Sequence, residues 1–319
     1  MLKKFTVLIV GAGRIGAFFD RPKTKEILTH AHAFSKHRGF KLVGFVDQDQ
    51  RQAQKAALVW GGRAYDNIDE AFKKNKIDVV VNATPDSEHF KTLNKIINQP
   101  IKLIFTEKPL TATPKEAKKI IALAKQKKVA IAVNYNRSFT PDFIKLQQAI
   151  KRGTYGEYLT GTGYYGKGFL HNGSHLINLL LLLVGDIQTI RPVHRQYDYF
   201  KTDPSLSGVL YFNSRKPFFI QSVDSRFYTI FEIDLVFSRA RIRIVDSGFV
   251  IERYQVKKDR RYAGYQKLEL AKKNQTKLSR SLYYAADNLY NYLQGQAELG
   301  CSLNDGYKTM QAIFNALKK

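Results

Sequence analysis

The sequence predicts an α/β protein with two domains, an N-terminal doubly wound parallel sheet and a C-terminal α+β domain built on a large, mostly antiparallel sheet. From residue 5 to about 133, short apolar runs alternate with helical patterns, as in a parallel sheet with helices on both faces. Beyond about residue 188, aromatic-rich runs of alternating polarity follow one another between turn signals, as in antiparallel strands. We therefore expect one domain at 1–133 and a second at 134–319.

The elements of the first domain follow in order. Strands are expected near 5–10, 41–46, 77–83, 102–106 and 129–133, and helices near 27–37, 50–58, 67–74, 88–97 and 114–127. The last helix has a clear start, because Thr113 can cap it, Pro114 suits its first position and Glu116 lies in its first turn. Ligands of such a sheet bind at the carboxyl ends of its strands, so the segments after those strands are where a site is expected.

The second domain is expected to alternate between helices and a sheet. Helices are predicted at 141–152, 174–184, 279–297 and 303–318, and strands at 157–165, 188–199, 206–213, 217–224, 229–237, 240–246 and 249–256. The many Tyr and Phe side chains on these strands offer one broad apolar face, which can pack on the domain's own helices or form a subunit contact. We expect a homodimer or a homotetramer that associates through this sheet.

A glycine motif follows the first strand directly, in the segment Gly11-Ala12-Gly13-Arg14-Ile15-Gly16. In such a G-x-G-x-x-G pattern the first glycine permits a tight turn, the second lets the backbone approach a pyrophosphate, and the third permits close packing of the following helix. The pattern predicts that a nicotinamide or flavin nucleotide binds here.

The second strand ends in Asp47, an acid of the kind that hydrogen-bonds the adenosine ribose. The usual spacing is about 20 residues, whereas Gly16 and Asp47 lie 31 positions apart. We interpret residues 18–37 as a loop inserted before the helix; a structural turn with an unrelated acid is the alternative for these two features. A carboxylate at 47 would repel a 2′-phosphate and favours NAD, although Arg51 leaves NADP open.

Length and composition indicate a two-domain globular protein. The chain has 319 residues, of which 44% are hydrophobic. Cys301 is its single cysteine, which excludes an intrachain disulfide and fits a reducing cytosol. The apolar segment after the first residues spans about six positions, too few for a signal peptide. The longest apolar stretch, 176–184, is well short of the ~20 residues of a membrane span. We expect a cytoplasmic protein without such a span.

The formal net charge of +25 is compatible with nucleic acid, an acidic membrane or a phosphorylated substrate. The lysines are spread along the chain in pairs, and no basic helix interleaved with aromatic residues is present in the sequence. We therefore favour solvated lysines over nucleic-acid binding. The charge also suits an anionic nucleotide sugar.

Two segments carry residues suited to proton transfer. Lys108, in Thr106-Glu107-Lys108-Pro109, can hydrogen-bond a substrate oxygen and stabilise the charge that develops there. Taken alone, the motif fits a surface lysine paired with Glu107 better than it fits a catalytic lysine. If 171–178 is helical, His171, His175 and Asn178 project on one side, where imidazoles can exchange protons at neutral pH.

Alternatives for the second segment remain. A metal could bind the two histidines, but no third ligand or H-E-x-x-H pattern accompanies them, and we expect no metal. They could also be structural polar residues at a helix start. The acid/base interpretation leads only when it is combined with Lys108 and the nucleotide site. The remaining histidines are interpreted mostly as helix-surface or packing residues: His30, His32, His37 and His89.

Nearly the whole chain resembles the Gfo/Idh/MocA oxidoreductases, the family of glucose-fructose oxidoreductase and inositol dehydrogenase. The motifs that carry this resemblance are Gly11–Gly16, Asp47, Asn82-Ala83-Thr84-Pro85 with His89, Glu107-Lys108-Pro109, Val133-Asn134-Tyr135-Asn136-Arg137 and Gly173-Ser174-His175. The resemblance implies a Rossmann domain followed by an open-faced mixed sheet, bound NAD(H) or NADP(H), and hydride exchange at a sugar or cyclitol carbon. It also implies that the lysine of E-K-P and the histidine at 175 contact the reacting oxygen.

The resemblance further implies roles for individual residues. Cofactor contacts are expected from Gly11, Gly13, Arg14, Ile15, Gly16, Asp47, Thr84, Pro85, His89, Glu107 and Lys108. Substrate contacts are expected from Lys108, Tyr135, Arg137, His171, Asn172 and His175, of which Lys108, His175 and His171 are the catalytic candidates. This chain departs from the family at two positions. It has His171 where many members have an aspartate, and Asn178 where a further aspartate often follows. These replacements shift the expected proton transfer to His175 with Lys108.

The favoured function is an NAD(P)-dependent sugar oxidoreductase. The segment 171–175 is similar to that of relatives associated with surface-polysaccharide sugar biosynthesis, which favours a nucleotide sugar as substrate. The rival hypothesis is a regulator that senses a cofactor or sugar on the same fold without turnover. Because such a regulator would be expected to lose the lysine and the histidine, and both are retained, we favour the enzyme.

Overall fold

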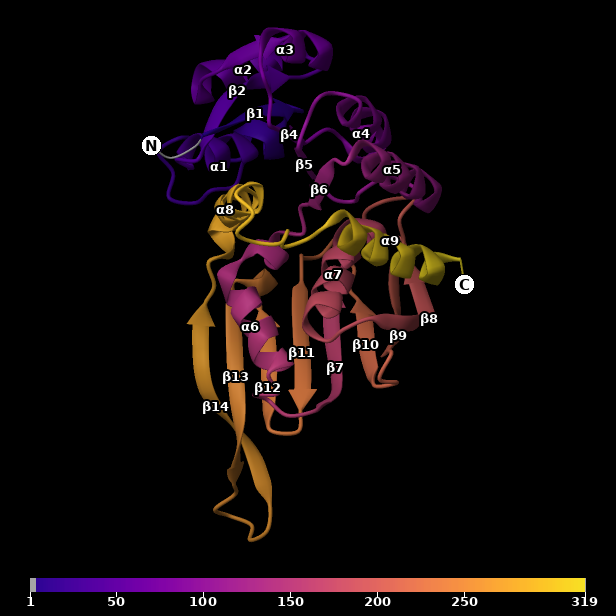
Figure 1. Ribbon diagram of the computed structural model, residues 1–319. Helices are drawn as coiled ribbons and strands as arrows, with labels where there is room; N and C mark the ends of the chain where they lie inside the picture. The colour runs from indigo at the N-terminus through magenta and orange to yellow at the C-terminus, as the bar shows by residue number, and fades with distance from the viewer. Residues whose placement is uncertain (1–3, 319) are drawn as a thin grey trace. The chain divides into compact units, whose positions relative to one another are not determined.

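The structure, a computed structural model, describes residues 4–318 and contains two compact units, each with its own sheet (Figure 1). One unit comprises the chain as far as Thr140 together with Ser279–Lys308. The other comprises Pro141–Leu278 and the residues from Thr309 onward. The predicted division at 133/134 thus differs in two respects: the first unit extends a few residues further, and a helical segment from late in the chain belongs to it.

The N-terminal unit contains a parallel six-stranded sheet in the order β3-β2-β1-β4-β5-β6. Its strands are β1 Phe5–Val10, β2 Phe40–Val46, β3 Arg63–Tyr65, β4 Val79–Asn82, β5 Leu103–Thr106 and β6 Ala130–Val133. The predicted strands are all present. β3 was missed, because a three-residue strand is too short to show a periodic pattern. The strand order reverses between β1 and β4, and ligands bind at such a switch point.

Helices connect these strands. They are α1 His30–Lys36, α2 Gln50–Trp60, α3 Ile68–Lys74, α4 His89–Ile97 and α5 Pro114–Lys127. The predicted start of α5 is confirmed, because Thr113 accepts from the Glu116 N–H at 3.3 Å and the Glu116 carboxylate accepts from the Thr113 N–H at 3.0 Å. These reciprocal bonds satisfy two donors that a helix start leaves unpaired.

A later helix, α8 Ser281–Leu293, also packs in the N-terminal unit, against α1. Its Tyr290 ring lies 5.9 Å from the Phe5 ring. Gly39 is required there, since a Cβ at that position would lie 2.3 Å from the Tyr290 ring. Helical periodicity predicts an apolar face but not its partner, so the sequence pattern assigned this helix to the second domain.

The second unit contains an eight-stranded sheet in the order β14-β13-β12-β11-β7-β10-β9-β8. Its strands are β7 Tyr158–Tyr165, β8 Ile187–Gln196, β9 Ser205–Phe212, β10 Pro217–Ser222, β11 Phe231–Phe237, β12 Ala240–Val245, β13 Val250–Lys258 and β14 Gln266–Gln275. β7 pairs with β10 in parallel, and the other neighbouring strands pair antiparallel. The predicted fold class is therefore confirmed. β14 was missed because its residues are mostly exposed and its apolar alternation is limited to Leu268 and Leu270.

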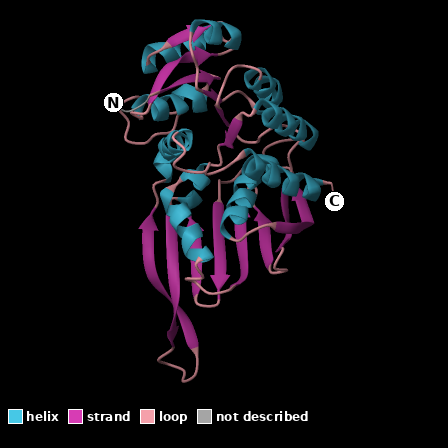
Figure 2. Cartoon of the chain, viewed as in Figure 1, coloured by secondary structure: helices cyan, strands magenta, loops and turns pink. Residues whose placement is uncertain are grey.

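One face of this sheet is covered by α6 Pro141–Lys151 and α7 Ser174–Leu183 (Figures 1 and 2). Its inward side chains, such as Phe218, Ile233 and Ile242, form one apolar core with the leucines of α7. The apolar stretch at 176–184 is thus a buried helix, as predicted. Within residues 4–318, no helix combines the length and apolar character that a bilayer crossing requires. The last helix, α9, spans Leu303–Leu317.

Candidate active site

The glycine loop follows β1 and leads into a short turn of π-helix, η1 Arg14–Phe18. Gly11 has a φ of +97°, and a Cβ there would lie 2.4 Å from the Ala83 carbonyl oxygen. A Cβ at Gly16 would lie 2.0 Å from the Gly11 carbonyl oxygen. Around Gly13, in contrast, a Cβ would meet no atom within 4 Å. The first and third glycines thus serve the fold, and the second leaves an open approach to the backbone that suits a pyrophosphate.

Asp47 lies against this loop. One oxygen of its carboxylate accepts from the Ala12 N–H at 2.6 Å, and the other accepts from the Asp49 N–H at 2.9 Å. The acid at the end of β2 is therefore beside the glycine loop despite the long spacing in sequence. Exposed Arg51 lies in the first turn of α2. This arrangement fits a dinucleotide, and a contact between Asp47 and ribose stays a prediction.

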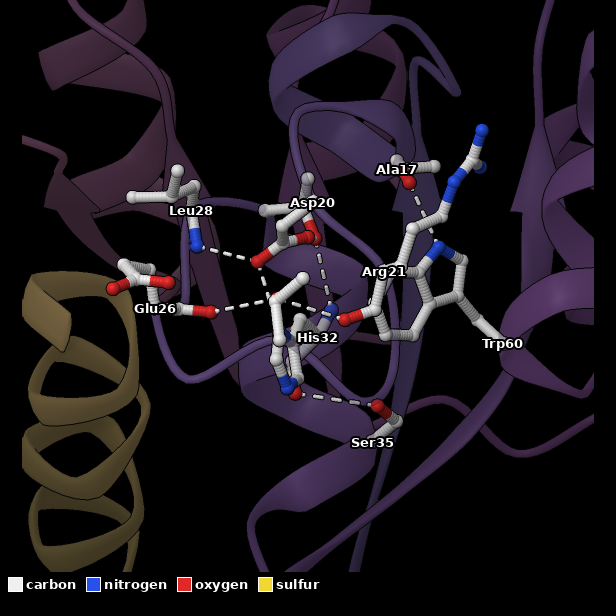
Figure 3. A network of polar contacts seen from close by, with 10 residues as sticks. Ala17, Asp20, Arg21, Glu26, Leu28, His32, Ser35 and Trp60 are labelled. Carbon is white, nitrogen blue, oxygen red and sulfur yellow. Dashed lines mark hydrogen bonds and ion pairs between the residues drawn. The ribbon is translucent and has the colours of Figure 1, made fainter. Parts of the chain in front are cut away.

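The long spacing comes from a structured insertion. A loop follows η1, as interpreted from the sequence, and α1 begins at His30. The buried Asp20 carboxylate accepts from the Leu28 N–H and the Thr29 hydroxyl, both at 2.6 Å, and lies 2.8 Å from His32 Nδ1 (Figure 3). The Trp60 ring is tilted by 32° against the His32 ring, with centroids 5.2 Å apart. The Trp60 Nε1–H donates to the Ala17 carbonyl. The inserted segment is therefore fixed by buried polar bonds.

The histidines of this segment are buried rather than on the helix surface. His30, His32 and His37 have exposed fractions of 0%, 1% and 7%. Each imidazole meets a carboxylate, at 2.8 Å to Glu107, 2.8 Å to Asp20 and 3.3 Å to Asp287 respectively. The surface part of the prediction for these three residues is thus wrong, because isolated histidines in a sequence do not show which carboxylates the fold brings to them.

The E-K-P motif begins directly after β5, two strands away from β1. The Glu107 N–H donates to the Asn82 carbonyl at 2.9 Å, which ties the motif to the end of β4. The Glu107 carboxylate accepts from Asn134 at 2.6 Å and meets His30 Nε2 at 2.8 Å. Lys108 follows it, half-buried, and the Lys108–Pro109 peptide is cis. Glu107 is thus held by buried partners from other segments, and the role of Lys108 stays a prediction.

Electrostatics keep Glu107 ionised. Burial by itself would raise the pKa of its carboxyl, but the contacts with His30 and Asn134 and the charge of Lys108 outweigh it, so the pKa lies below its usual value. Sequence reasoning gave neither His30 nor Asn134 a role here. Asn134 belongs to a recognised motif, whereas His30 is 77 positions from Glu107 and no local pattern joins them.

The segment after β4 carries the next predicted contacts. Thr84 donates to the Asn82 side chain at 2.8 Å, and Pro85 is exposed. His89 is fully buried, with Nδ1 at 2.6 Å from the Pro109 carbonyl and Nε2 at 3.0 Å from the Thr84 carbonyl. Its ring therefore joins the loops that follow β4 and β5. A direct contact between His89 and a cofactor stays a prediction.

Tyr135 and Arg137 follow β6, the last strand of this sheet, and both are buried. Burial lowers the pKa of the Arg137 guanidinium to about 9, which still leaves it charged at neutral pH. Contacts of these two side chains with a substrate stay predictions.

In the second unit, a turn of π-helix, η4 Gly168–Gly173, precedes α7. The N–H groups of Leu170 and His171 both donate to the Asp203 carboxylate at 2.8 Å. Burial raises the pKa of Asp203 despite these donors. Gly168 has a φ of +80°, and a Cβ there would lie 2.1 Å from an Asp203 oxygen. The acid thus organises the segment that presents the predicted histidines.

The predicted side-chain set of this segment is only partly brought together. His171 and His175 are half-exposed, and the His171 ring lies 4.9 Å from the Phe200 ring. Asn172 donates to the Gly166 carbonyl at 3.0 Å. Asn178 is buried and donates to the Thr309 hydroxyl at 3.1 Å. Asn178 therefore contacts a side chain in the interior of its unit, and His171 lies in η4, before the regular helix begins at Ser174. A joint role of Asn178 with the two histidines stays a prediction.

Within the N-terminal unit, the predicted cofactor residues gather along one sheet edge, after β1, β2, β4 and β5. Such a glycine loop at the switch point of a parallel sheet defines a dinucleotide-binding α/β domain. Residues 5–135 match the model of the oxidoreductase family with an NAD-binding Rossmann fold. This segment belongs to the Gfo/Idh/MocA oxidoreductase family, so the resemblance drawn from the motifs is confirmed.

Known proteins similar to the chain include sugar and cyclitol dehydrogenases. The inositol 2-dehydrogenase of Rhizobium meliloti (strain 1021) is 30% identical over 151 residues, 47% of this chain and 41% of that protein. The chain spans about half the length of the curated relatives it matches.

Two solved structures extend the likeness to nearly the whole chain. The UDP-N-acetylglucosamine 3-dehydrogenase GnnA from Acidithiobacillus ferrooxidans aligns with a TM-score of 0.76 at 16% identity, over 98% of this chain and 96% of that one. The WlbA dehydrogenase from Bordetella pertussis, in complex with NADH and UDP-GlcNAcA, aligns with a TM-score of 0.77 at 17% identity, over 99% and 96%. At these identities the likeness shows the fold alone.

Proposed function

We propose that this protein transfers a hydride between the nicotinamide of NAD and a hydroxyl- or ketone-bearing carbon of a sugar, and that the sugar is linked to a nucleotide. The observation that carries the proposal is the position of Lys108, half-buried directly after β5 on the sheet edge that also holds the glycine loop. A lysine there can hydrogen-bond the oxygen of the reacting carbon, which is where charge develops during hydride transfer.

In this proposal the cofactor would be held by the backbone of the glycine loop and by Asp47, and it supplies the hydride acceptor or donor. Lys108 donates a hydrogen bond to the substrate oxygen and stabilises its negative charge. His175 takes the proton from the hydroxyl in oxidation and returns it in reduction, as an imidazole can near neutral pH. His171 is the second candidate for this proton transfer.

Three observations support the finer parts of the proposal. Asp47 lies against the glycine loop as a carboxylate, which disfavours a 2′-phosphate and supports NAD over NADP. The net charge of +25 favours an anionic substrate. A protein of the same fold was solved with NADH and a UDP-sugar acid. Together they support a nucleotide sugar as the substrate class.

The cofactor and the substrate can be tested separately. NADH and NADPH binding is measured by fluorescence titration, and we expect the dissociation constant of NADH to be at least about 10-fold lower because of Asp47. A clear preference for NADPH would contradict this part.

Turnover is then measured with NAD⁺ and a panel of UDP- and dTDP-sugars, with myo-inositol as the uncharged comparison. Turnover of a nucleotide sugar is expected. Turnover of myo-inositol alone would retain the oxidoreductase and overturn the nucleotide-sugar assignment. Tight cofactor binding without turnover of any member would instead favour the sensing regulator.

A further inference from the structure

We propose that His30 is a positioning residue of the active site, which holds the Glu107 carboxylate and thereby fixes the surroundings of the neighbouring Lys108. The inference rests on the proposed function, because it assigns His30 to the reaction that Lys108 assists. His30 comes from the inserted segment, far from the E-K-P motif in sequence. The geometry that supports this role consists of a buried contact, a defined tautomer and an independent anchor for the segment.

The contact is closed to solvent on the histidine side. The His30 imidazole is 0% exposed, and its Nε2 lies 2.8 Å from a Glu107 oxygen. Its ring also meets the Phe105 ring edge-on, with centroids 5.3 Å apart and an interplanar angle of 85°. Asn134 donates to the same Glu107 oxygen at 2.6 Å. Two donors from different segments therefore converge on one carboxylate oxygen.

The other ring nitrogen indicates which way the hydrogen bond runs. His30 Nδ1 is buried and has no hydrogen-bond partner among the residues that the structure describes. A proton on Nδ1 would be left without an acceptor, whereas a proton on Nε2 points to Glu107. The geometry therefore favours the tautomer in which Nε2 donates to the carboxylate.

Contacts within the inserted segment hold His30 in place, and none of them involves Glu107. Thr29 caps α1 by accepting from the His32 N–H at 3.1 Å. The Thr29 hydroxyl in turn donates to buried Asp20, which also binds the Leu28 N–H and His32 (Figure 3). Since His30 is the first residue of α1, this cap sets the direction of its side chain. The segment that lengthens the glycine-to-acid spacing thus supplies a contact to the catalytic motif.

The consequence for Lys108 follows from charge. A carboxylate that is held and ionised next to an ammonium group attracts it, and the charge of Lys108 contributes to the low pKa of Glu107. Loss of the His30 contact would leave Asn134 as the remaining donor to that Glu107 oxygen, so the carboxylate would be held less firmly and the lysine would be less well placed. A small misplacement of a group that acts in the transition state lowers turnover more than it lowers ground-state binding.

The test uses two substitutions at one position. Glutamine carries its side-chain nitrogen about as far from the backbone as His Nε2, whereas asparagine carries it only as far as Nδ1. His30→Gln should therefore keep the donor to Glu107, and His30→Asn should lose it. His37→Asn is the matched control, because it makes the same change at the end of the same helix, where the partner is Asp287 rather than Glu107.

Four quantities are measured on the 319-residue chain. They are kcat and KM with the best nucleotide sugar of the panel, the NADH dissociation constant, and the pKa of Glu107 by ¹³C NMR without cofactor. We expect His30→Asn to lower kcat about 10-fold while KM and the NADH dissociation constant change less than about threefold, as for a small displacement of a catalytic group. The pKa of Glu107 should rise in the same variant. His30→Gln should recover most of kcat, and His37→Asn should resemble the unchanged protein.

Two outcomes overturn the inference. One is an unchanged kcat and an unchanged Glu107 titration in His30→Asn. The other is an equal loss of kcat in both asparagine variants in proportion to lost folded protein, which would indicate a merely structural role. If no substrate is turned over, the proposed function fails, and the Glu107 titration still decides whether His30 holds this carboxylate.

Discussion

The two sheets of this protein bury their side chains in different ways. In the parallel sheet, all residues of β4 and β5 are buried, so these strands have no solvent-facing side. In the second sheet, β11 and β12 alternate between buried and half-buried residues. A parallel sheet with helices on both faces can present ligand-binding groups only at its edge, whereas a sheet covered on one side leaves a whole face available.

The side chains at the edge of the parallel sheet and those on the open face of the second sheet differ in the same way. At the edge of the parallel sheet, Glu107 is held by buried polar partners. On the second sheet, Phe219 is 45% exposed and Tyr164 is 36% exposed. The open face of that sheet also carries an ion pair between Arg243 and Glu252 at 3.0 Å. The first edge thus holds polar side chains in buried contacts, whereas the second sheet leaves aromatic side chains exposed on its open face. Association between subunits through that face stays a prediction.

The largest expected effect is at the edge of the parallel sheet. Lys108→Ala should lower kcat by about 10²- to 10⁴-fold, because it removes the group proposed to act on the substrate oxygen. The NADH dissociation constant should change less than about threefold, because the glycine loop is untouched. Steady-state kinetics and fluorescence titration check the two values. Unchanged turnover would show that the edge does not carry the chemistry.

Substitutions at two adjacent residues test the two faces of the second sheet independently. Phe218 is 0% exposed and Phe219 is 45% exposed. Phe218→Ala should lower the free energy of unfolding by about 3–5 kcal/mol, since it leaves a cavity in the core. Phe219→Glu should change it by less than about 0.5 kcal/mol but weaken self-association. Denaturant unfolding and light scattering measure these quantities; a full-size oligomer with Phe219→Glu would argue against this face as the interface.

The glycine loop offers a matched pair in the first unit. Gly11→Ala should lower the free energy of unfolding by about 1–3 kcal/mol, because the residue has a positive φ and the new Cβ would meet the Ala83 carbonyl. Gly13→Val should leave the melting temperature nearly unchanged, since a Cβ there meets no protein atom within 4 Å. It should nevertheless weaken NADH binding at least about 10-fold by blocking the approach to the backbone. Unweakened binding would exclude Gly13 from the cofactor site.

The smallest effect concerns pH and an acid of the second unit. Burial works against ionisation of Asp198, but donors from Lys167, Ser225 and Ser205 lower its pKa to about 2. A pKa below that of the unfolded chain stabilises the fold above about pH 4, and the contribution is lost as pH falls toward 2. Asp198→Asn should therefore cost about 2 kcal/mol at pH 7 and flatten the pH dependence of unfolding between pH 4 and 2. A stability profile identical to that of the unchanged protein would contradict this.

Sequence reasoning was most successful where local pattern and structure coincide. Continuous apolar runs predicted the buried parallel strands, and Thr113 with Glu116 predicted the start of α5. Three-residue β3 and charged β14 have no such pattern and were missed. The predicted cofactor residues Gly11, Asp47, Thr84 and Lys108 do lie after strands on the same side of the parallel sheet, because the carboxyl ends of parallel strands share one edge.

Other features depend on contacts between distant residues. No short segment of the sequence predicts the contact of His30 with Glu107 or the packing of α8 against α1. Asn178 donates to Thr309, which is 131 positions away in the sequence, and no local pattern predicts that contact.

The amino-acid sequence by itself determined the class of fold, the glycine loop and the motifs of the family, because periodicity and backbone freedom depend on residues within a few positions of one another. Only the tertiary structure decided which carboxylate each buried histidine contacts and in which unit α8 packs. Those choices depend on how apolar faces pack across the whole chain, and packing joins residues that no local pattern relates.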